Sequence, residues 1–522
     1  MAKYILRRVL HGIFSIVVVV GIVMVLIYSL LSRDQIFATD PNFIKVAANR
    51  KITYKYEKWE EFGYLDYVNY TDWLTDLVTN GELAAEARSK LTNLGKDAES
   101  DKENVAEYVK KFTDYYESKG YTVTRLKTVM AGKKVTNGGQ PQLFAAKDIP
   151  VLMRLLTYFG NLFQVDTVNS AKNYEGERKI TFTLYDPLYG GQKFSPAIMG
   201  QGTFHKYLLY FDNEFPYIHQ NLLSVNLGVS YSVNQGVEVV TTMTKAQGSY
   251  VQRMTTYPTG LTEMSADDLH SATYMAGSRD SIQLRKDRFL DDYTTTITFK
   301  SGMSRIGYSF VIGLCSVLLT YLIGVPRAIW MAQKKDKAVD KIGSVYVVFI
   351  TAMPSLAYIF LVKAIGNKIG IPTTFNIEEF SWTMCVLPII SLSLRPIGSM
   401  MRWLRRYMVD QQNADYVKFA RSGGLSEREI FTRHILKNAS IPIIYGIPGS
   451  ILFSMTGALV TERVYTVPGI GGIFINAINA YDNGVIVGVA LFYAVLSVVS
   501  GILGDIMMSI VDPRISFSSK AR

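Results

Sequence analysis

Long apolar stretches divide this chain into three parts. The first stretch, Gly12–Leu31, has twenty residues without a charge, about the ~20 residues that an α-helix needs to cross ~30 Å of hydrocarbon. Five further stretches follow late in the chain, at about 306–331, 342–365, 381–401, 441–461 and 485–511. The pattern predicts an α-helical membrane protein with six spans, the first of them an uncleaved helix rather than a signal peptide.

The region between the first and second spans, residues 33–300, contains no long apolar run. The segments ELAAEARSKL and NVAEYVKKFTDYYESKG have helical patterns, whereas KITFTLYDPLYGG and HKYLLYFD have strand patterns that end in turn residues. Its aromatic content and balanced charge are the opposite of a disordered composition. We therefore expect three parts: 1–32 with the first span, a large mixed α/β domain at 33–300, and a five-helix core at 301–522.

The charge distribution indicates which way the spans run. Residues 33–300 carry 31 Lys and Arg against 32 Asp and Glu, so the net charge of +11 comes from the remainder of the chain. If the N-terminus is cytoplasmic, the segments on that side (1–11, 327–341, 402–437 and 512–522) contain 19 basic residues, and the short segments on the other side contain three. Basic residues favour the cytoplasmic side of a span. The counts predict both termini inside and the 33–300 domain outside.

The composition excludes several classes of function. The basic excess lies beside spans and not on a soluble domain, which argues against a nucleic-acid partner. Cys315 and Cys385 both lie in apolar spans, so the outer domain has to fold without disulfides, which favours a bacterial envelope. The five histidines show no metal-ligand spacing, and no nucleophile motif or phosphate-binding loop occurs. We therefore expect no catalytic residue, no metal and no cofactor bound by this chain.

Two charged residues interrupt predicted spans. Arg395 precedes Arg402 by seven residues in the fourth span, and Asp505 precedes Asp512 by seven in the sixth. At ~1.5 Å per residue, both lie roughly 10 Å from the inner boundary. Charges at this depth normally face protein or water. The two side chains can form an ion pair, or Arg395 can extend towards the cytoplasm or contact a partner.

The segment ADYVKFARSGGLSEREIFTRHILKNASIP, within a loop at 402–440, has two well-defined helical patterns between the fourth and fifth spans. Asn413 can cap the first helix, the glycines at 423–424 can end it, and Ser426 with Glu429 can form a capping box for the second. One face of the first helix carries Tyr416, Phe419, Ala420 and Gly423. Helices with such clear start and stop signals suit a rigid docking element, although a helical hairpin that packs on its own bundle would have the same pattern.

The loop sequence YVKFARSGGLSEREIFTRHILKNASIP resembles the cytoplasmic coupling loop of ATP-binding-cassette importer permeases, in the oligopeptide and dipeptide branch. YILRRVLHGIFSIVVV, LLSVNLGVSYS, TERVYTVPGIGGIFINAI and LGDIMMSIVDPRI resemble other segments of that family, in the same order along the chain. The resemblance covers roughly residues 1–32 and 218–515, and it is strongest to B-type subunits of the streptococcal Ami type. It implies the type I importer fold, with six transmembrane helices.

The resemblance implies a permease subunit that moves oligopeptides or dipeptides into a bacterial cell. It implies a plasma-membrane location and favours a Gram-positive cell. In that family a second, homologous permease completes the pathway, two cytoplasmic ATPases use ATP and Mg, and an external lipid-anchored binding protein delivers the peptide. The chain itself would then not be an enzyme. The loop residues that would contact an ATPase are Tyr416, Phe419, Ala420, Gly423, Gly424 and Leu425.

The segment TERVYTVPGIGGIF after the fifth span is expected to return to the outer face of the membrane and to help close the pathway. Proline and glycine interrupt any continuing helix there, while the residues between them remain apolar. An ordinary outer loop is the alternative. The candidate gate residues are Val464, Val467, Pro468, Gly469, Ile470 and Gly471.

Two features depart from the family pattern. The family's loop motif begins Glu-Ala-Ala, with a glycine four residues after the second alanine; Ala420 and Gly424 fit it, but Lys418 and Phe419 occupy the first two positions. A contact based on that glutamate is therefore not carried over. The region 33–216 is far larger than in most relatives, and it can either position the binding protein or pack around the partner permease.

Other functions fit part of the pattern. A permease of the same branch for nickel or another small solute would share the spans and the loop. A membrane receptor would explain a large ligand-sensing ectodomain but not the loop, and the chain contains no recognisable output domain. A secondary transporter would show duplicated spans with paired broken helices, which this sequence lacks.

Overall fold

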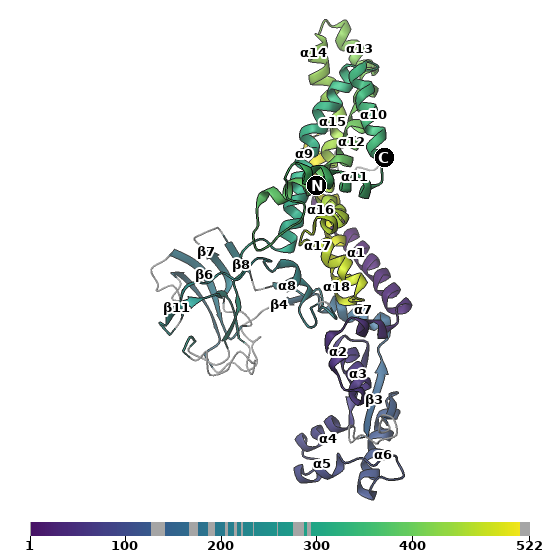
Figure 1. Ribbon diagram of the computed structural model, residues 1–522, viewed down its shortest axis with the longest axis vertical. Coiled ribbons are helices and arrows are strands. Elements are labelled where there is room, and N and C mark those ends of the chain that lie inside the picture. Colours follow the sequence, from purple (N-terminus) through teal and green to yellow (C-terminus); the bar gives the residue numbers. More distant parts are fainter. Residues whose placement is uncertain are drawn as a thin grey trace.

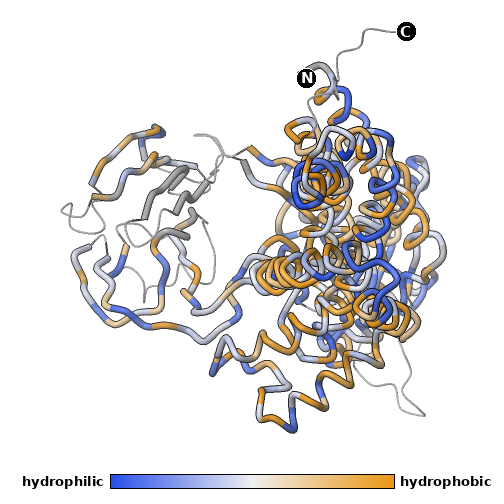
Figure 2. The backbone as a smooth tube through the Cα atoms, turned by 90° about the horizontal axis from the view of Figure 1, so that it is seen from above, coloured by the Kyte–Doolittle hydropathy of each residue, from blue (hydrophilic) through white to orange (hydrophobic). Residues whose placement is uncertain are grey.

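The structure, a computed structural model, describes residues 2–126, 141–165, 176–185, 194–203, 207–212, 217–220, 223–232, 234–257, 259–274, 287–289 and 294–511. The described elements form an elongated molecule with a helical body and two lobes (Figure 1). The helical body comprises α1 (Ala2–Leu30) and the helices from α9 (Arg305–Gln333) onward. Apolar residues are frequent along the clustered helices, although polar residues occur among them (Figure 2).

The body is built around two long helices, α9 and α12, which pack along their lengths, while α18 packs against α1 and α16. The remaining elements of the body are α10 (Ala338–Ala352), α11 (Ser355–Lys368), the 3₁₀ turn η6 (Trp382–Cys385), α12 (Val386–Gln412), α13 (Asp415–Ser422), α14 (Glu427–Glu429), the π-helical η7 (Ile430–Leu436), α15 (Lys437–Tyr445), α16 (Ile447–Tyr465), α17 (Ile470–Asn479) and α18 (Asn483–Val511).

Four helices in the described part of the chain are long and apolar enough to cross a membrane: Tyr4–Ser29, Arg305–Gln333, Trp382–Gln412 and Asn483–Val511. The stretch predicted as one span at 342–365 is instead two helices, α10 and α11, which meet at 109° and make a fifth span if the bent pair crosses as one. Pro354 explains the break, because it cannot continue the hydrogen bonding of α10 and it favours an extended Met353.

The stretch predicted as the fifth span, 441–461, is also divided. Gly446 ends α15, and α16 begins directly after it with Pro448 in its first turn. Neither helix is among the four that reach the length and apolar character of a complete span. The six-span count therefore stays a prediction that requires α10–α11 and α15–α16 each to cross as one span.

The helical lobe, residues 33–148, follows α1 directly. Its centre is an antiparallel sheet in the order β1-β3-β2, with Tyr67 opposite Ala146 and Thr124 opposite Phe144. The predicted helices at 82–91 and 104–120 are confirmed as α5 and α6. The elements are η1 (Arg33–Ala38), α2 (Pro41–Lys45), η2 (Ala48–Arg50), α3 (Lys51–Glu61), β1 (Leu65–Asn69), α4 (Tyr70–Thr79), α5 (Ala85–Leu91), α6 (Glu103–Ser118), β2 (Thr122–Leu126) and β3 (Gln142–Asp148).

Two cores lie on opposite faces of this sheet. Successive residues of a strand point to opposite faces. Leu143 and Ala145 of β3 accordingly pack with α4, α5 and α6, whereas Phe144 packs with Trp59 of α3. The sheet thus fixes the position of α4–α6 relative to the rest of the lobe.

The β lobe, residues 163–298, is connected to the helical lobe by α7 (Val151–Gly160). Its largest sheet is antiparallel in the order β5-β6-β7-β8, so each strand pairs with its neighbour in the sequence. The strands predicted in KITFTLYDPLYGG and HKYLLYFD are confirmed as β5 and β7. The elements are β4 (Phe163–Val165), β5 (Lys179–Tyr185), β6 (Phe194–Gln201), β7 (Tyr207–Asp212), β8 (Tyr217–Gln220), β9 (Leu223–Val225), α8 (Val239–Thr244), β10 (Arg253–Thr256), β11 (Thr262–Ser265), β12 (Asp267–Tyr274) and β13 (Thr294–Thr298).

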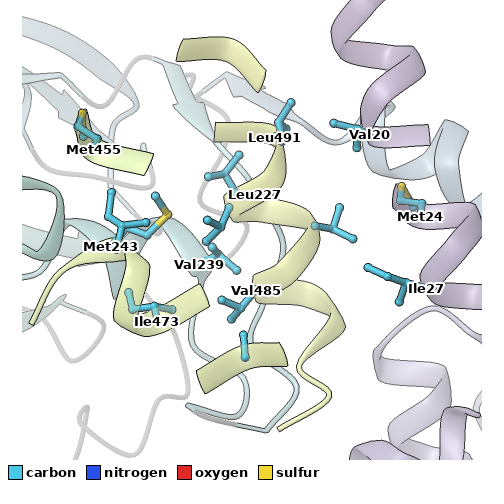
Figure 3. Packing of buried hydrophobic residues seen from close by; sticks show 14 residues of the cluster. Val20, Met24, Ile27, Leu227, Val239, Met243, Met455, Ile473, Val485 and Leu491 are labelled. Atoms are coloured by element: carbon cyan, nitrogen blue, oxygen red, sulfur yellow. The ribbon is translucent and has the colours of Figure 1, made fainter. Parts of the chain in front are cut away.

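A shared apolar core joins α1 to α18 and to the segment 226–243. Val20, Met24 and Ile27 of α1 lie on the side of that helix that faces Leu227 and Leu491 (Figure 3). The lobes are therefore attached to the helical body by packed side chains as well as by the chain connection.

The segment 227–232 lies directly on the start of α18. Gly484 permits this approach, because a Cβ at that position would lie 1.9 Å from the carbonyl oxygen of Val229. Beside it, the buried carboxylate of Asp482 accepts hydrogen bonds from the backbone N–H groups of Tyr231 at 2.8 Å and Ser232 at 3.2 Å. A buried carboxylate with several donors is well satisfied, so this contact is a fixed joint between the lobes and the body.

Candidate coupling and translocation site

The 413–440 loop forms one end of the molecule, at the opposite end from α4–α6 (Figure 1). Its first helix, α13, follows Ala414, and no side chain caps it. The predicted cap, Asn413, is wrong: α12 continues to Gln412 and leaves Asn413 in helical conformation, with φ −92° and ψ −3°. An N-cap residue needs an extended conformation, which Ala414 has instead.

The turn after α13 has the predicted geometry. Gly424 has a φ of +79°, and Ser426 and Glu429 form the reciprocal capping box, with both backbone-to-side-chain distances at 3.3 Å. Arg421 bridges the two short helices, since its Nη2 donates to Glu427 Oε2 at 3.1 Å. Hydrogen bonding from Arg421 holds the pKa of Glu427 below its usual value. The turn is therefore fixed by local contacts on both sides.

The inner side of α13 is anchored by Val417, which is fully buried. It packs in a cluster with Leu404 and Met408 of α12 and with Ile430 and Ile435 of η7. Val417 was not predicted as a functional residue from the sequence, although its spacing of three positions from Ala420 puts both on one side of the helix. This anchor connects any movement of α13 to α12 and η7.

The outer side of α13 carries the predicted contact residues. Phe419 is 83% exposed, against 36% for Tyr416 and 40% for Leu425. Tyr416, Gly423, Gly424 and Leu425 are also exposed, whereas Ala420 is half-buried and belongs to the Val417 cluster. The structure therefore places five of the six candidates at the surface of the loop, around an unusually exposed aromatic ring.

A cavity of about 840 Å³ lies in the body between α9, α12, α15, α16 and α18. Its wall contains many hydroxyl groups, among them those of Ser316, Thr320, Ser450, Ser454, Ser497 and Ser500. This set of residues was not predicted from the sequence. The sequence does contain hydroxyl residues three or four positions apart within apolar spans, a spacing that puts each pair on one helix face.

Arg395 and Asp505 lie in different surroundings. Arg395 lines the 840 Å³ cavity, and none of the residues that the structure describes forms an ion pair with it. Asp505 instead pairs with Arg8 of α1, at 2.8 Å between Oδ2 and Nη2, and accepts a hydrogen bond from Tyr4 at 3.1 Å. The direct Arg395–Asp505 pair considered from the sequence is therefore not formed, because the first helix supplies the partner of Asp505.

The predicted gate segment wraps around Glu462, a buried residue of α16. Its carboxylate accepts hydrogen bonds from Ser309 Oγ at 2.6 Å and from the backbone N–H of Gly472 at 3.3 Å. A Cβ at Gly469 would lie 2.3 Å from this carboxyl group, so a larger residue there would have to displace the Glu462 side chain. Val467, Pro468, Gly469, Ile470 and Gly471 are buried and Val464 is half-buried, and none of the six candidates lines the described cavity.

A family model for binding-protein-dependent transport system inner membrane components matches residues 324–517, which include the loop and most of the cavity. The oligopeptide transport system permease protein AmiC of Streptococcus pneumoniae is 34% identical over 530 residues, covering 100% of this chain and 99% of AmiC. The chain belongs to this family of membrane permeases. Its members are transport subunits, so the function of the chain is transport rather than catalysis.

Other relatives match the permease over a shorter range. The dipeptide transport system permease protein DppB of Lactococcus lactis is 29% identical over 229 residues, which are 43% of this chain and 73% of DppB. The oligopeptide transport system permease protein AppB of Bacillus subtilis is 29% identical over 243 residues, 43% of this chain and 76% of AppB. Among solved structures, an inward-facing MetNI methionine ABC transporter is 12% identical and covers 40% of this chain and 94% of that chain, with a TM-score of 0.34, too low to support an argument.

Proposed function

We propose that this permease is one of two membrane subunits of a bacterial peptide importer. The observation that carries the proposal is the 34% identity with AmiC, because it extends through both lobes as well as the helical body. The shorter matches to DppB and AppB support the same class of substrate, since both are named as peptide permeases. A second, homologous permease would complete the pathway, and a lipid-anchored binding protein would deliver oligopeptides or dipeptides from outside a Gram-positive cell.

The proposed orientation has six spans, with both termini and the 413–440 loop in the cytoplasm and both lobes outside. It is supported by the basic residues beside the predicted inner ends of the spans. It is also supported by the separation of the loop from α4–α6 along the length of the molecule (Figure 1). In this orientation the helical lobe lies where an external binding protein would dock.

We propose that α13 is the contact with a partner ATPase that hydrolyses ATP with Mg. Phe419 would enter a groove on the ATPase, as amphipathic helices commonly do at such interfaces. Val417 and the Arg421–Glu427 pair would then carry the movement of the ATPase to α12 and η7, because they keep α13 in a fixed position on the body.

We propose that the 840 Å³ cavity is the part of the peptide pathway that this subunit forms. Its hydroxyl groups can exchange hydrogen bonds with peptide amides as these move past, and Arg395 can attract a carboxylate. A mainly apolar wall with scattered hydroxyl groups suits peptides of varied sequence, because no single side chain of the substrate is required. Selection among peptides would then rest with the binding protein.

The test is uptake by the complete importer reconstituted in liposomes, with its partner permease, ATPases and binding protein. We expect ATP-dependent accumulation of a radiolabelled peptide, and none when the binding protein is omitted or ATP is replaced by a non-hydrolysable analogue. Accumulation of radioactive nickel without peptide would overturn the substrate but keep the transport function. ATP-independent peptide uptake would overturn the importer mechanism.

A further inference from the structure

We propose that α7 lies in the outer leaflet of the membrane, with Leu152, Met153 and Leu156 in contact with lipid acyl chains. These three side chains are 69%, 55% and 57% exposed in the chain. Single exposed apolar residues are common on protein surfaces, but three on one side of a short helix form a patch that is poorly suited to water. An occupant of apolar chemistry is therefore expected there.

The helix has three distinct sides, which follow from its 3.6 residues per turn. Leu155 and Phe159 point into the core shared with α1. Arg154 and Tyr158 line a polar pocket of about 260 Å³, together with Asn161 just after the helix. The third side, opposite this pocket, carries the three exposed residues Leu152, Met153 and Leu156.

The single charged residue of α7 is held away from the exposed side. The guanidinium of Arg154 lies over the ring of Tyr28 at 3.6 Å and over the ring of Tyr64 at 3.9 Å from the ring centres. Such cation–π contacts stabilise a cation that has lost part of its water. The exposed side of α7 therefore carries no charge, which suits contact with lipid acyl chains.

The contact with α1 gives the depth of α7. A Cβ at Gly21 would lie 3.1 Å from Leu155 Cδ1, so α7 packs directly on α1 at this glycine. Gly21 precedes Leu31, the end of the apolar stretch, by ten residues, or about 15 Å along the helix. This places part of α7 within the thickness of the hydrocarbon. The choice of the outer leaflet rests on the proposed orientation of α1, whereas the contact with lipid does not.

Lipid fits this side of the molecule better than a second permease does. Only 22% of the apolar window of α1 is buried, against 39%, 44% and 33% for the other three helices of membrane-crossing length in the described chain. The cavity that the second permease is proposed to complete is lined by α9, α12, α15, α16 and α18, and α1 and α7 contribute none of its described lining residues. The side of the body that carries α1 and α7 is thus the side left to lipid.

Site-directed spin labelling of the complete importer in liposomes of phosphatidylethanolamine and phosphatidylglycerol tests the proposal. Cys315 and Cys385 are first replaced by alanine, and single cysteines are introduced by Leu152→Cys and Leu156→Cys. Val25→Cys on α1 is the lipid reference, and Ile44→Cys, an equally apolar exposed residue of the helical lobe, is the water reference. We expect labels at 152 and 156 to collide with oxygen several-fold more than with a water-soluble nickel chelate, as at 25 and in contrast to 44.

Two results would overturn the proposal. Chelate accessibility at 152 and 156 equal to that at 44 would place α7 in water, and low accessibility to both reagents would show that protein covers it. If the cysteine variants do not assemble, Leu156→Trp provides a second measurement, because acyl-chain-brominated lipid should quench its added fluorescence; no quenching beyond that of the parent complex would equally contradict lipid contact. Peptide uptake by the same complexes separates this outcome from a failure of the transport function.

Discussion

Phe419 is the residue at which the coupling proposal makes its clearest prediction. Its ring is exposed in the isolated chain and would be buried against an ATPase. Central aromatic residues of interfaces contribute about 2 kcal/mol or more, which corresponds to roughly 30-fold in affinity. We expect Phe419→Ala to weaken ATPase association by that order or to uncouple ATP hydrolysis from uptake, measured together in reconstituted liposomes.

Lys418→Ala is the matched control in the same helical turn. Lys418 pairs with Asp415, at 2.9 Å on an exposed surface, and such pairs contribute about 0–1 kcal/mol. Its uptake and assembly should stay close to those of the parent protein. Normal assembly and normal coupling in Phe419→Ala would mean that α13–α14 is a connector and not the contact with the ATPase.

A second residue-scale prediction concerns Asp101 in the helical lobe. Its side chain is almost fully buried and accepts hydrogen bonds from both terminal nitrogens of Arg125, at 2.6 and 2.7 Å. Arg125 lowers the pKa of Asp101 below its ordinary value. The pair therefore stabilises the folded lobe above the unfolded pKa of about 3.9, and this contribution is lost as pH falls through the lower folded pKa.

Asp101→Asn should accordingly destabilise the lobe by about 1.5–3 kcal/mol at neutral pH. Hydrogen exchange of residues 95–126, corrected for the intrinsic pH dependence of exchange, measures the loss. The difference in lobe stability between the variant and the parent should shrink at pH values below the pKa of Asp101 in the folded protein. A difference that is constant from neutral pH to strong acid would contradict the assigned role of the carboxylate.

Among the elements, α18 offers a test of the joint between lobes and body. Gly484→Ala places a methyl group where the Val229 carbonyl lies, and overpacking of this kind costs about 1–3 kcal/mol. Gly501→Ala in the same helix is the control, because nothing lies within 4 Å of its added Cβ and alanine favours a helix by up to about 1 kcal/mol. Gly484→Ala should lower the thermal unfolding temperature of the complex, whereas Gly501→Ala should leave it unchanged or raise it.

The elements also show where sequence reasoning succeeds. The α13–α14 turn was predictable because Gly424, Ser426 and Glu429 act within a few residues of one another. The prediction that Asn413 caps α13 was wrong because α12 continues to Gln412, and the length of α12 depends on tertiary packing. Pro354 was visible in the sequence, but the 109° angle between α10 and α11 depends on how they pack. The partner of Asp505 could not be found locally either, since Arg8 lies almost 500 positions away.

For the whole molecule, the open question is what the helical lobe contributes to transport. Asn69 of β1 is paired with Phe144 of β3, so residues 70–141 can be replaced by a short glycine-serine turn. The deletion exposes the face of β3 that packs on α4–α6, and Leu143→Thr makes that face more polar. We expect this variant to assemble with its partners and to retain basal ATP hydrolysis, because the joint at Asp482 is untouched, but to lose most of the stimulation by the binding protein.

The control for the deletion is the full-length chain with Leu143→Thr alone. If the shortened variant kept full stimulation by the binding protein, the lobe would serve in packing or stability and not in docking. The comparison is informative because the lobe has its own two cores on the two faces of one sheet, so removal of one of them leaves the other in place.

The open cavity also bears on how the cell makes this protein. A newly inserted copy without its partner would present hydroxyl groups and Arg395 to the bilayer, and a charged side chain that faces the hydrocarbon raises the free energy of insertion. We expect such unpartnered copies to be less stable in the membrane than the assembled pair. Balanced synthesis of the two permeases is therefore expected, with the surplus of either one degraded rather than stored.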